Sequence, residues 1–222
     1  MSVTLESIAT SDNFSTAALS SGPTGAVQRG DLLVALFLYQ DFGSGSTTLA
    51  VTDDAGNAYT TSYALAETNQ FWMAIAWAIA AADVPGGVTM TATMGASRFF
   101  STLSALVVRS SLGPFTAPPT NGAPNAAGTN SALADVPLVL VVPGFVAALL
   151  ASPAPPSTPG AGYSIVATSP GFSYETLWGP AIGAGAQDVT ATFTAGKWGM
   201  VAEAFREPMV GVVDPVGFGA EL

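Results

Sequence analysis

The sequence predicts an all-β protein, a two-sheet antiparallel β-sandwich of jelly-roll or immunoglobulin-like type, built from two sequence-related halves. Two observations predict it. Apolar and polar residues alternate with a period of two in several segments, as they do in strands that bury one face. The same order of segments then occurs twice along the chain, which indicates a duplicated unit. Stretches rich in Gly, Pro, Asp and Asn separate the segments and favour turns.

The repeat is clearest in two eight-residue segments, VTMTATMG and VTATFTAG, which are identical at five positions. They begin 101 residues apart, at Val88 and Val189. We therefore expect one sandwich domain over residues 1–207, with halves of about 1–111 and 133–207, although two immunoglobulin-sized modules are the alternative. A connection rich in Pro, Asn and Gly, residues 112–132, joins the halves. Further matches lie at nearly the same spacing: Trp77 with Trp178, Tyr59 with Tyr163, and Asp31 with Asp135.

Each half is expected to contain a long apolar strand, a turn, a Tyr-bearing strand, a Trp-bearing strand, a Thr-alternating strand and a final apolar strand. In the Thr-alternating strand of the first half, the residues from Val88 to Met94 at every second position face inward, and the threonines between them face outward. The segment from Val189 repeats this pattern. The apolar run from Pro137 to Ala151 is interrupted by Pro143 and Gly144, so it predicts two buried strands around a bend and not a membrane span.

Residues 71–83 are rich in Ala and long enough for a helix. The corresponding segment of the second half contains Gly179 and Pro180, which a helix interior does not tolerate, so both segments are predicted to be strands. The bulky residues of the first segment then form an inner row, and its alanines form a flat outer row that would pack on a neighbouring molecule. The inner row is Met73, Ile75, Trp77 and Ile79, and the outer row is Ala74, Ala76 and Ala78.

Composition limits the classes of partner. The chain has 5 Lys and Arg against 15 Asp and Glu, so we expect neither a nucleic-acid partner nor binding to an acidic membrane surface. Hydrophobic residues make up 49% of the chain and charged residues 9%, which predicts an outer surface partly covered by neighbouring molecules. A general bias toward small apolar residues is the alternative. The first residues, MSVTLESIATSD, lack the features of a secretory leader, which predicts synthesis in the cytoplasm.

The stretch VTDDAGNAYT contains adjacent acids, Asp53 and Asp54, that suggest a metal loop, a catalytic pair or a turn. Neighbouring side chains diverge in an extended backbone, and the spacing does not match a calcium loop. Asp and Asn favour turns by accepting bonds from nearby amides, and Gly56 supplies a positive φ. The stretch is therefore predicted to be a turn.

No other motif predicts chemistry. The chain has no His and no Cys, which excludes disulfides, thiolate chemistry and ordinary serine triads. A glycosidase needs only two facing carboxylates, and four acids near predicted strand ends keep that class open: Glu67, Asp83, Glu175 and Asp188. We interpret them as solvated surface acids and expect no catalytic residue, metal or cofactor.

Aromatic and basic residues are the remaining candidates for binding. Trp77 and Trp178 are predicted to be core residues, whereas Trp72 and Trp198 are predicted to be more exposed and able to stack on a sugar. The isolated cations are expected to lie at the rim of the sheets, with an inter-subunit ion pair as the sharper hypothesis. They are Arg29, Arg98, Arg109, Lys197 and Arg206.

The order GDLLVALFLY, VTDDAGNAYTTSYAL, FWMAIAWAIA, PGGVTMTATM and LSALVVR resembles a β-sandwich module of tailed-phage virion proteins and of some bacterial surface proteins. The resemblance covers roughly residues 1–207 and implies no catalytic residues. It implies a capsid-decorating or accessory virion protein that binds other virion proteins and copies of itself. A carbohydrate-binding or adhesion module of a phage tail or bacterial surface is the alternative. Residues 208–222, an apolar extension rich in Pro and Gly, are predicted to serve as an assembly arm.

Overall fold

The computed structural model describes residues 3–40, 49–66, 71–115, 125–140, 142–152, 157–169 and 174–208, and these residues form two antiparallel sheets. The sheet of the first half contains β1 (Val3–Ser20), β2 (Leu32–Gln40), β3 (Leu49–Asp53), β4 (Thr60–Ala66), β5 (Phe71–Ile79) and β6 (Met90–Ser110). The sheet of the second half contains β7 (Asn125–Leu140), β8 (Gly144–Ala151), β9 (Thr158–Pro159), β10 (Ser164–Ser169), β11 (Tyr174–Ile182) and β12 (Gly185–Arg206). The prediction of an all-β, antiparallel fold is confirmed.

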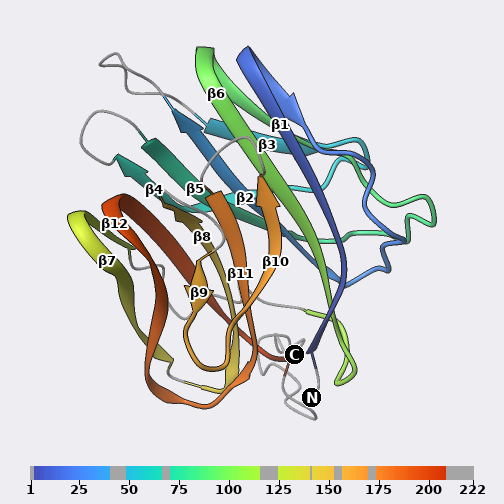
Figure 1. Ribbon diagram of the computed structural model, residues 1–222. Coiled ribbons are helices and arrows are strands. Elements are labelled where there is room, and N and C mark those ends of the chain that lie inside the picture. Colours follow the sequence, from blue (N-terminus) through green and yellow to red (C-terminus); the bar gives the residue numbers. More distant parts are fainter. Residues whose placement is uncertain are drawn as a thin grey trace, which may run out of the picture.

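The two sheets have the same connectivity. The first has the strand order β1-β6-β2-β5-β4, with β3 paired to β6. The second has the order β10-β11-β8-β12-β7, with β9 paired to β12. Each strand of the first half therefore has one counterpart in the second: β1 corresponds to β7, β2 to β8, and so on to β6 and β12. In Figure 1 the first half runs from blue to green, and the second half runs from yellow to red beside it.

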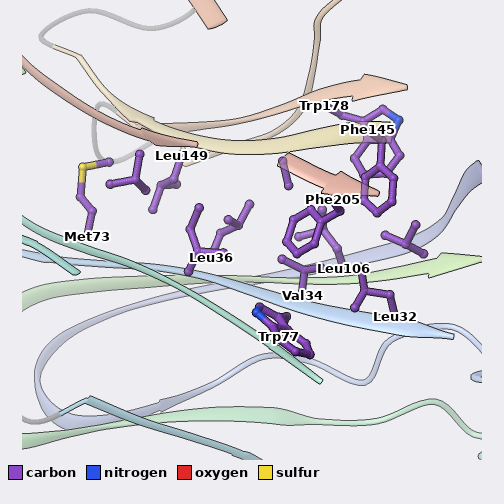
Figure 2. Packing of buried hydrophobic residues seen from close by; sticks show 14 of the residues in the cluster. Leu32, Val34, Leu36, Met73, Trp77, Leu106, Phe145, Leu149, Trp178 and Phe205 are labelled. Carbon is purple, nitrogen blue, oxygen red and sulfur yellow. The ribbon is translucent and has the colours of Figure 1, made fainter. Parts of the chain in front are cut away.

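The two sheets share one hydrophobic core. Side chains at every second position of β2 and β5 point toward those of β8, β11 and β12, and Figure 2 shows Leu36 and Leu149 facing one another across this space. The aromatic ring of Phe145 lies 5.2 Å from that of Phe205 and 5.1 Å from that of Trp178. Trp77 is buried in the same cluster. The two halves are therefore joined through a continuous core.

Each sheet also folds over itself, which gives four layers of strands. The part of β6 between Met90 and Met94 pairs with β3, and its later part, from Phe100 to Val108, pairs with β2. The buried side chains of the first part, together with Leu103, Ala105 and Val107 of the later part, belong to one cluster inside the first half. β12 is divided in the same way between an outer layer with β7 and β9 and an inner layer with β8. Irregularities in the register lie where these long strands change layer, as expected for bulges that bend a strand.

This folding corrects the prediction for the alanine row of β5. Ala74, Ala76 and Ala78 are buried, and Ala76 and Ala78 pack against the outer layer of the same half. The flat row therefore packs within its own chain and not on a neighbouring molecule. Strand structure in both Trp-bearing segments is confirmed, and a register irregularity follows Gly179 in β11.

Three further predictions differ from the structure. The Thr-alternating strand and the final apolar strand are one continuous strand in each half, β6 and β12. Residues 125–132, expected in the connection, form the first part of β7. Asp31 and Asp135 are not counterparts, because Asp31 precedes β2 whereas Asp135 lies within β7. The alternation that leads into β6 is as predicted, with Val88, Met90, Ala92 and Met94 buried.

Candidate functional site

The acidic stretch at residues 53–57 is a turn, as predicted. The Asp53 carboxylate accepts hydrogen bonds from the amides of Ala55 (3.1 Å) and Asn57 (3.0 Å), from the Asn57 side chain (2.7 Å) and from the Tyr59 hydroxyl (3.0 Å). Burial, followed by the charge of Asp53, raises the pKa of Tyr59. Asp54 instead accepts a bond from the Thr89 amide at 2.9 Å. The two acids thus hold different parts of the backbone.

The second half contains the same turn without the acids. The amide of Gly160 donates to Thr190 O at 2.7 Å, as the amide of Asp54 donates to Thr89 O at 3.3 Å. Gly56 and Gly162 both have positive φ, 77° and 88°. Since the counterpart turn forms without a carboxylate, the role of Asp53 is to order a longer loop. In the part of the chain that the structure describes, no group of three or more acidic side chains is placed to hold a metal ion.

The candidate catalytic acids have separate surroundings. Glu175 is buried and accepts hydrogen bonds from the amide of Ser157 at 2.7 Å and from its hydroxyl. Asp83 accepts a bond from the Arg29 amide at 2.7 Å, and Asp188 is exposed on β12. Glu67 lies outside the described residues. The prediction that these acids are solvated is therefore wrong for Glu175, which anchors the segment before β9.

The tryptophans are packed more deeply than predicted. Trp77 and Trp178 are core residues, which confirms that prediction. Trp198 is 5% exposed and packs against Phe193 inside the second half, so the prediction that it is exposed is wrong. Trp72 is half-buried, and its ring stacks on that of Tyr39 at 5.9 Å.

Among the described cationic side chains, Arg109 has a defined ion-pair partner. Its guanidinium binds both oxygens of buried Asp31, through Nε (2.9 Å) and Nη2 (2.7 Å), and donates to Glu6 at 3.0 Å. The hydrogen bond to Asp31 raises the pKa of Arg109. This ion pair lies within one chain, whereas the sharper hypothesis placed such pairs between subunits. Lys197 is exposed, Arg206 is half-buried, and the side chain of Arg98 lies outside the described part.

Arg29 borders a partly open depression of about 600 Å³ at one end of the first sheet. The amide of Phe115 fixes its floor by donating to Gly30 O at 2.8 Å. The described lining residues are Arg29, Gly30, Ile79, Ala80, Ala81, Pro114 and Phe115. This lining offers one charge and an apolar wall but no acid or nucleophile.

Hydroxyl groups join the halves at one side of the shared core. The carboxylate of Asp12 on β1 accepts bonds from Thr102 of β6 (2.7 Å), and from Ser169 (2.5 Å) and Tyr174 (3.2 Å) of the second half. Burial is the main reason that the pKa of Tyr174 is raised to about 12, so its hydroxyl keeps its proton and acts as a donor. This cluster is a polar clamp between the halves, and every group in it has a structural use.

The outer layer of the second half carries the most exposed apolar row of the described surface. β7 is an edge strand, and its side chains alternate between buried and exposed from Ala134 to Leu140. Val139 is 66% exposed and Leu133 is 45% exposed. Neighbouring positions of β12 add small and acidic residues. We call this surface the outer face: Leu133, Asp135, Pro137, Val139, Ala186, Asp188, Thr190 and Thr192.

The internal repeat provides a control for this surface. Leu133 pairs with Thr192 on β12, and Ser20 pairs with Thr91, the counterpart of Thr192, on β6. The first half therefore has a serine where the second half exposes a leucine. Ser20 bonds to the Thr91 hydroxyl at 2.8 Å, so this surface is small and polar. At this position, the exposed apolar side chain is specific to the second half.

The first half has its own exposed aromatic pair where β1 and β6 change layer. Phe14 is 55% exposed and Phe99 is 49% exposed. Their rings meet edge to face, with centroids 6.1 Å apart. This arrangement does not present two parallel ring faces, which a sugar-stacking platform would use.

Sequence comparisons add no functional assignment. No protein-family model matches the chain, and a search of curated proteins finds no match. In the described part of the chain, no helix is long and apolar enough to cross a membrane. The expected assembly arm, residues 208–222, lies outside the described residues except for Pro208.

Proposed function

We propose that the chain is a non-enzymatic structural protein of a tailed-phage virion, of the capsid-decorating or accessory kind, and that it docks on a protein lattice through the outer face. The observation that carries this proposal is the exposed apolar row of β7, Leu133, Pro137 and Val139, in the part of the strand that alternates regularly between buried and exposed residues. Apolar side chains gathered on one exposed surface mark sites of protein association. The resemblance to virion modules supplies the class of partner.

The charges of the outer face favour a partner of a different kind over a second copy. Asp135 lies on β7, within the apolar row, opposite Thr190 of β12. Asp188 lies on β12, next to the apolar row, opposite Pro137 of β7. The chain as a whole has a net charge of −10. Two copies would place like charges together, whereas a surface with apolar residues and basic groups would complement both features.

Edge pairing is a less suitable mode of association. β7 contains Pro137, which has no amide hydrogen to donate to an added strand. β1, the edge of the first sheet, has register irregularities between Leu5 and Ser7 and between Thr16 and Ala18. Proline and bulges both protect sheet edges from adding another strand. The side chains of the outer face are therefore the more suitable contact.

A charge substitution tests the proposal. We expect the wild-type chain to sediment with phage particles in a density gradient, and a Leu133→Lys/Val139→Lys variant to remain at the top of it. Both positions are exposed, so each substitution should change the free energy of unfolding by less than about 0.5 kcal/mol. Ser20→Lys, at the polar counterpart position, is the matched control and should sediment like wild type. Absence of the wild-type chain from particles would refute the proposal.

A further inference from the structure

Glu203 is a carboxyl group inside the core that joins the two halves. It lies on β12 between Val201 and Phe205, which point into the shared core, and it is 0% exposed. Neither oxygen of its carboxyl group has a hydrogen-bond partner in the described structure. A buried polar group without a partner costs free energy in any fold. Its presence there needs a reason.

The repeat shows that the fold does not need an acid at this position. In each half, the buried Trp pairs with a residue of the adjacent strand (β2 or β8), and that residue pairs in turn with one residue of the long strand (β6 or β12). The first half has a leucine at that place, buried in the same core. The two series are Trp77, Val34 and Leu106 in the first half, and Trp178, Ala147 and Glu203 in the second.

The residue that meets Glu203 from the other sheet is also polar. Ser62 lies at the register irregularity of β4, and its counterpart at the irregularity of β10 is Val166, which packs against the shared core. The Ser62 hydroxyl donates to Ile75 O at 3.1 Å. Glu203 thus corresponds to Leu106 of the first half, and Ser62 corresponds to Val166 of the second half.

Among the described side chains, none carries a charge that compensates the Glu203 carboxylate. β8 pairs with this part of β12. β5 and β4 pack against β12 from the other sheet, and β7 pairs with β12 as far as Val201, where its residues Asn125 and Ala126 are uncharged. β8 and β5 consist of uncharged, non-titrating residues, and the described side chains of β4 are Thr60, Thr61 and Ser62. Ionisation would therefore place an isolated negative charge in an apolar core.

We propose that Glu203 makes the packing of the two halves depend on protonation, so that the halves close on a dry core when the carboxyl group is neutral and loosen when it ionises. Burial raises the pKa of Glu203 to about 7, while the nearby Ser62 hydroxyl lowers it by a smaller amount. The device therefore responds near neutral pH. It would let the chain change the tightness of its interface between mildly acidic and mildly basic surroundings.

The sign of the effect follows from linkage. An unfolded glutamate releases its proton near pH 4.5, whereas the folded one retains it up to about pH 7. The stabilising effect of the proton is therefore complete below about pH 4.5, declines as the pH rises, and is lost above about pH 7. The pKa difference corresponds to a change of roughly 300-fold in the folding equilibrium constant.

Urea unfolding of the full chain from pH 5 to pH 9 tests the inference, with Glu203→Gln as an uncharged variant of the same shape and Glu203→Leu as the residue of the first half. We expect wild type to lose roughly 70-fold in folding equilibrium constant relative to both variants between pH 5 and pH 8. Acrylamide quenching of tryptophan emission at zero urea should rise with pH in wild type alone. Parallel stability profiles of wild type and either folded variant, or quenching that does not change with pH, would overturn it.

Discussion

Arg109 anchors a buried acid, and its removal is predicted to destabilise the first half strongly. Asp31 is 3% exposed and receives two hydrogen bonds from the Arg109 guanidinium, with one more from the Gln28 amide at 2.7 Å. Arg109→Met keeps an apolar stem but leaves Asp31 buried with the amide bond alone. Breaking a buried ion pair from one side costs about 3–5 kcal/mol, and partial exposure of Arg109 reduces this to about 2–4 kcal/mol.

The second half contains the matched control. Arg206 ends β12 much as Arg109 stands near the end of β6, but no ion pair to Arg206 is present among the described residues. Arg206→Met should therefore cost about 0.5 kcal/mol or less. Urea denaturation at pH 7, followed by tryptophan fluorescence, measures both free energies of unfolding. A double variant that combines Arg109→Met with Asp31→Asn should recover part of the loss. Equal losses for Arg109→Met and Arg206→Met would refute the reasoning.

Two further predictions concern the backbone. Gly144→Ala would place a Cβ 2.0 Å from Phe205 O at the end of the β8 and β12 pairing. Thermal unfolding should therefore show a loss of about 3 kcal/mol or more, whereas Gly86→Ala, with open space around it, should change little. Asp53→Ala removes the acceptor of four hydrogen bonds and should lower the free energy of unfolding in urea by about 1–3 kcal/mol. The control Asp188→Ala, on the exposed outer face, should lower it by less than about 0.5 kcal/mol. Similar values for the two variants would contradict the role given to Asp53.

Sequence alone predicts the parts of the fold that depend on local patterns. The alternation from Val88 to Met94 is a property of one strand, so it identifies the buried face without any knowledge of the partner strand. The turn at Asp53 also follows from local chemistry, because the acid bonds to amides two and four residues later. The duplication likewise predicts that both Trp-bearing segments take the same structure.

Features that depend on the tertiary fold are less accessible. β1 and the start of β7 are edge strands with polar or small residues and an irregular register, so their alternation is weak. The sequence does contain a pattern that indicates burial of the alanine row. β5 and β8 consist only of apolar residues, as is typical of strands that are covered on both faces.

The counterpart of Glu203 in the first half cannot be identified with a constant offset, because the long strands β6 and β12 differ in length. The spacing between counterparts is 101 residues at Val88 and Val189, but only 97 at Leu106 and Glu203. β6 therefore has four more residues than β12 between these points, near the place where both strands change layer. A constant offset of 101 residues would align Glu203 with Thr102, which lies in the polar clamp. A polar counterpart gives no indication that Glu203 lies in an apolar core.

Site-specific cross-linking can show whether the outer face of the second half contacts a virion partner. The chain has no cysteine, so Val139→Cys and the control Ser20→Cys each carry one photoactivatable label at a known exposed position. Labelled chains would be bound to purified phage particles, irradiated and analysed by mass spectrometry. We predict cross-links to a virion protein from position 139 and few or none from position 20. Equal cross-linking from both positions, or none from position 139, would contradict it.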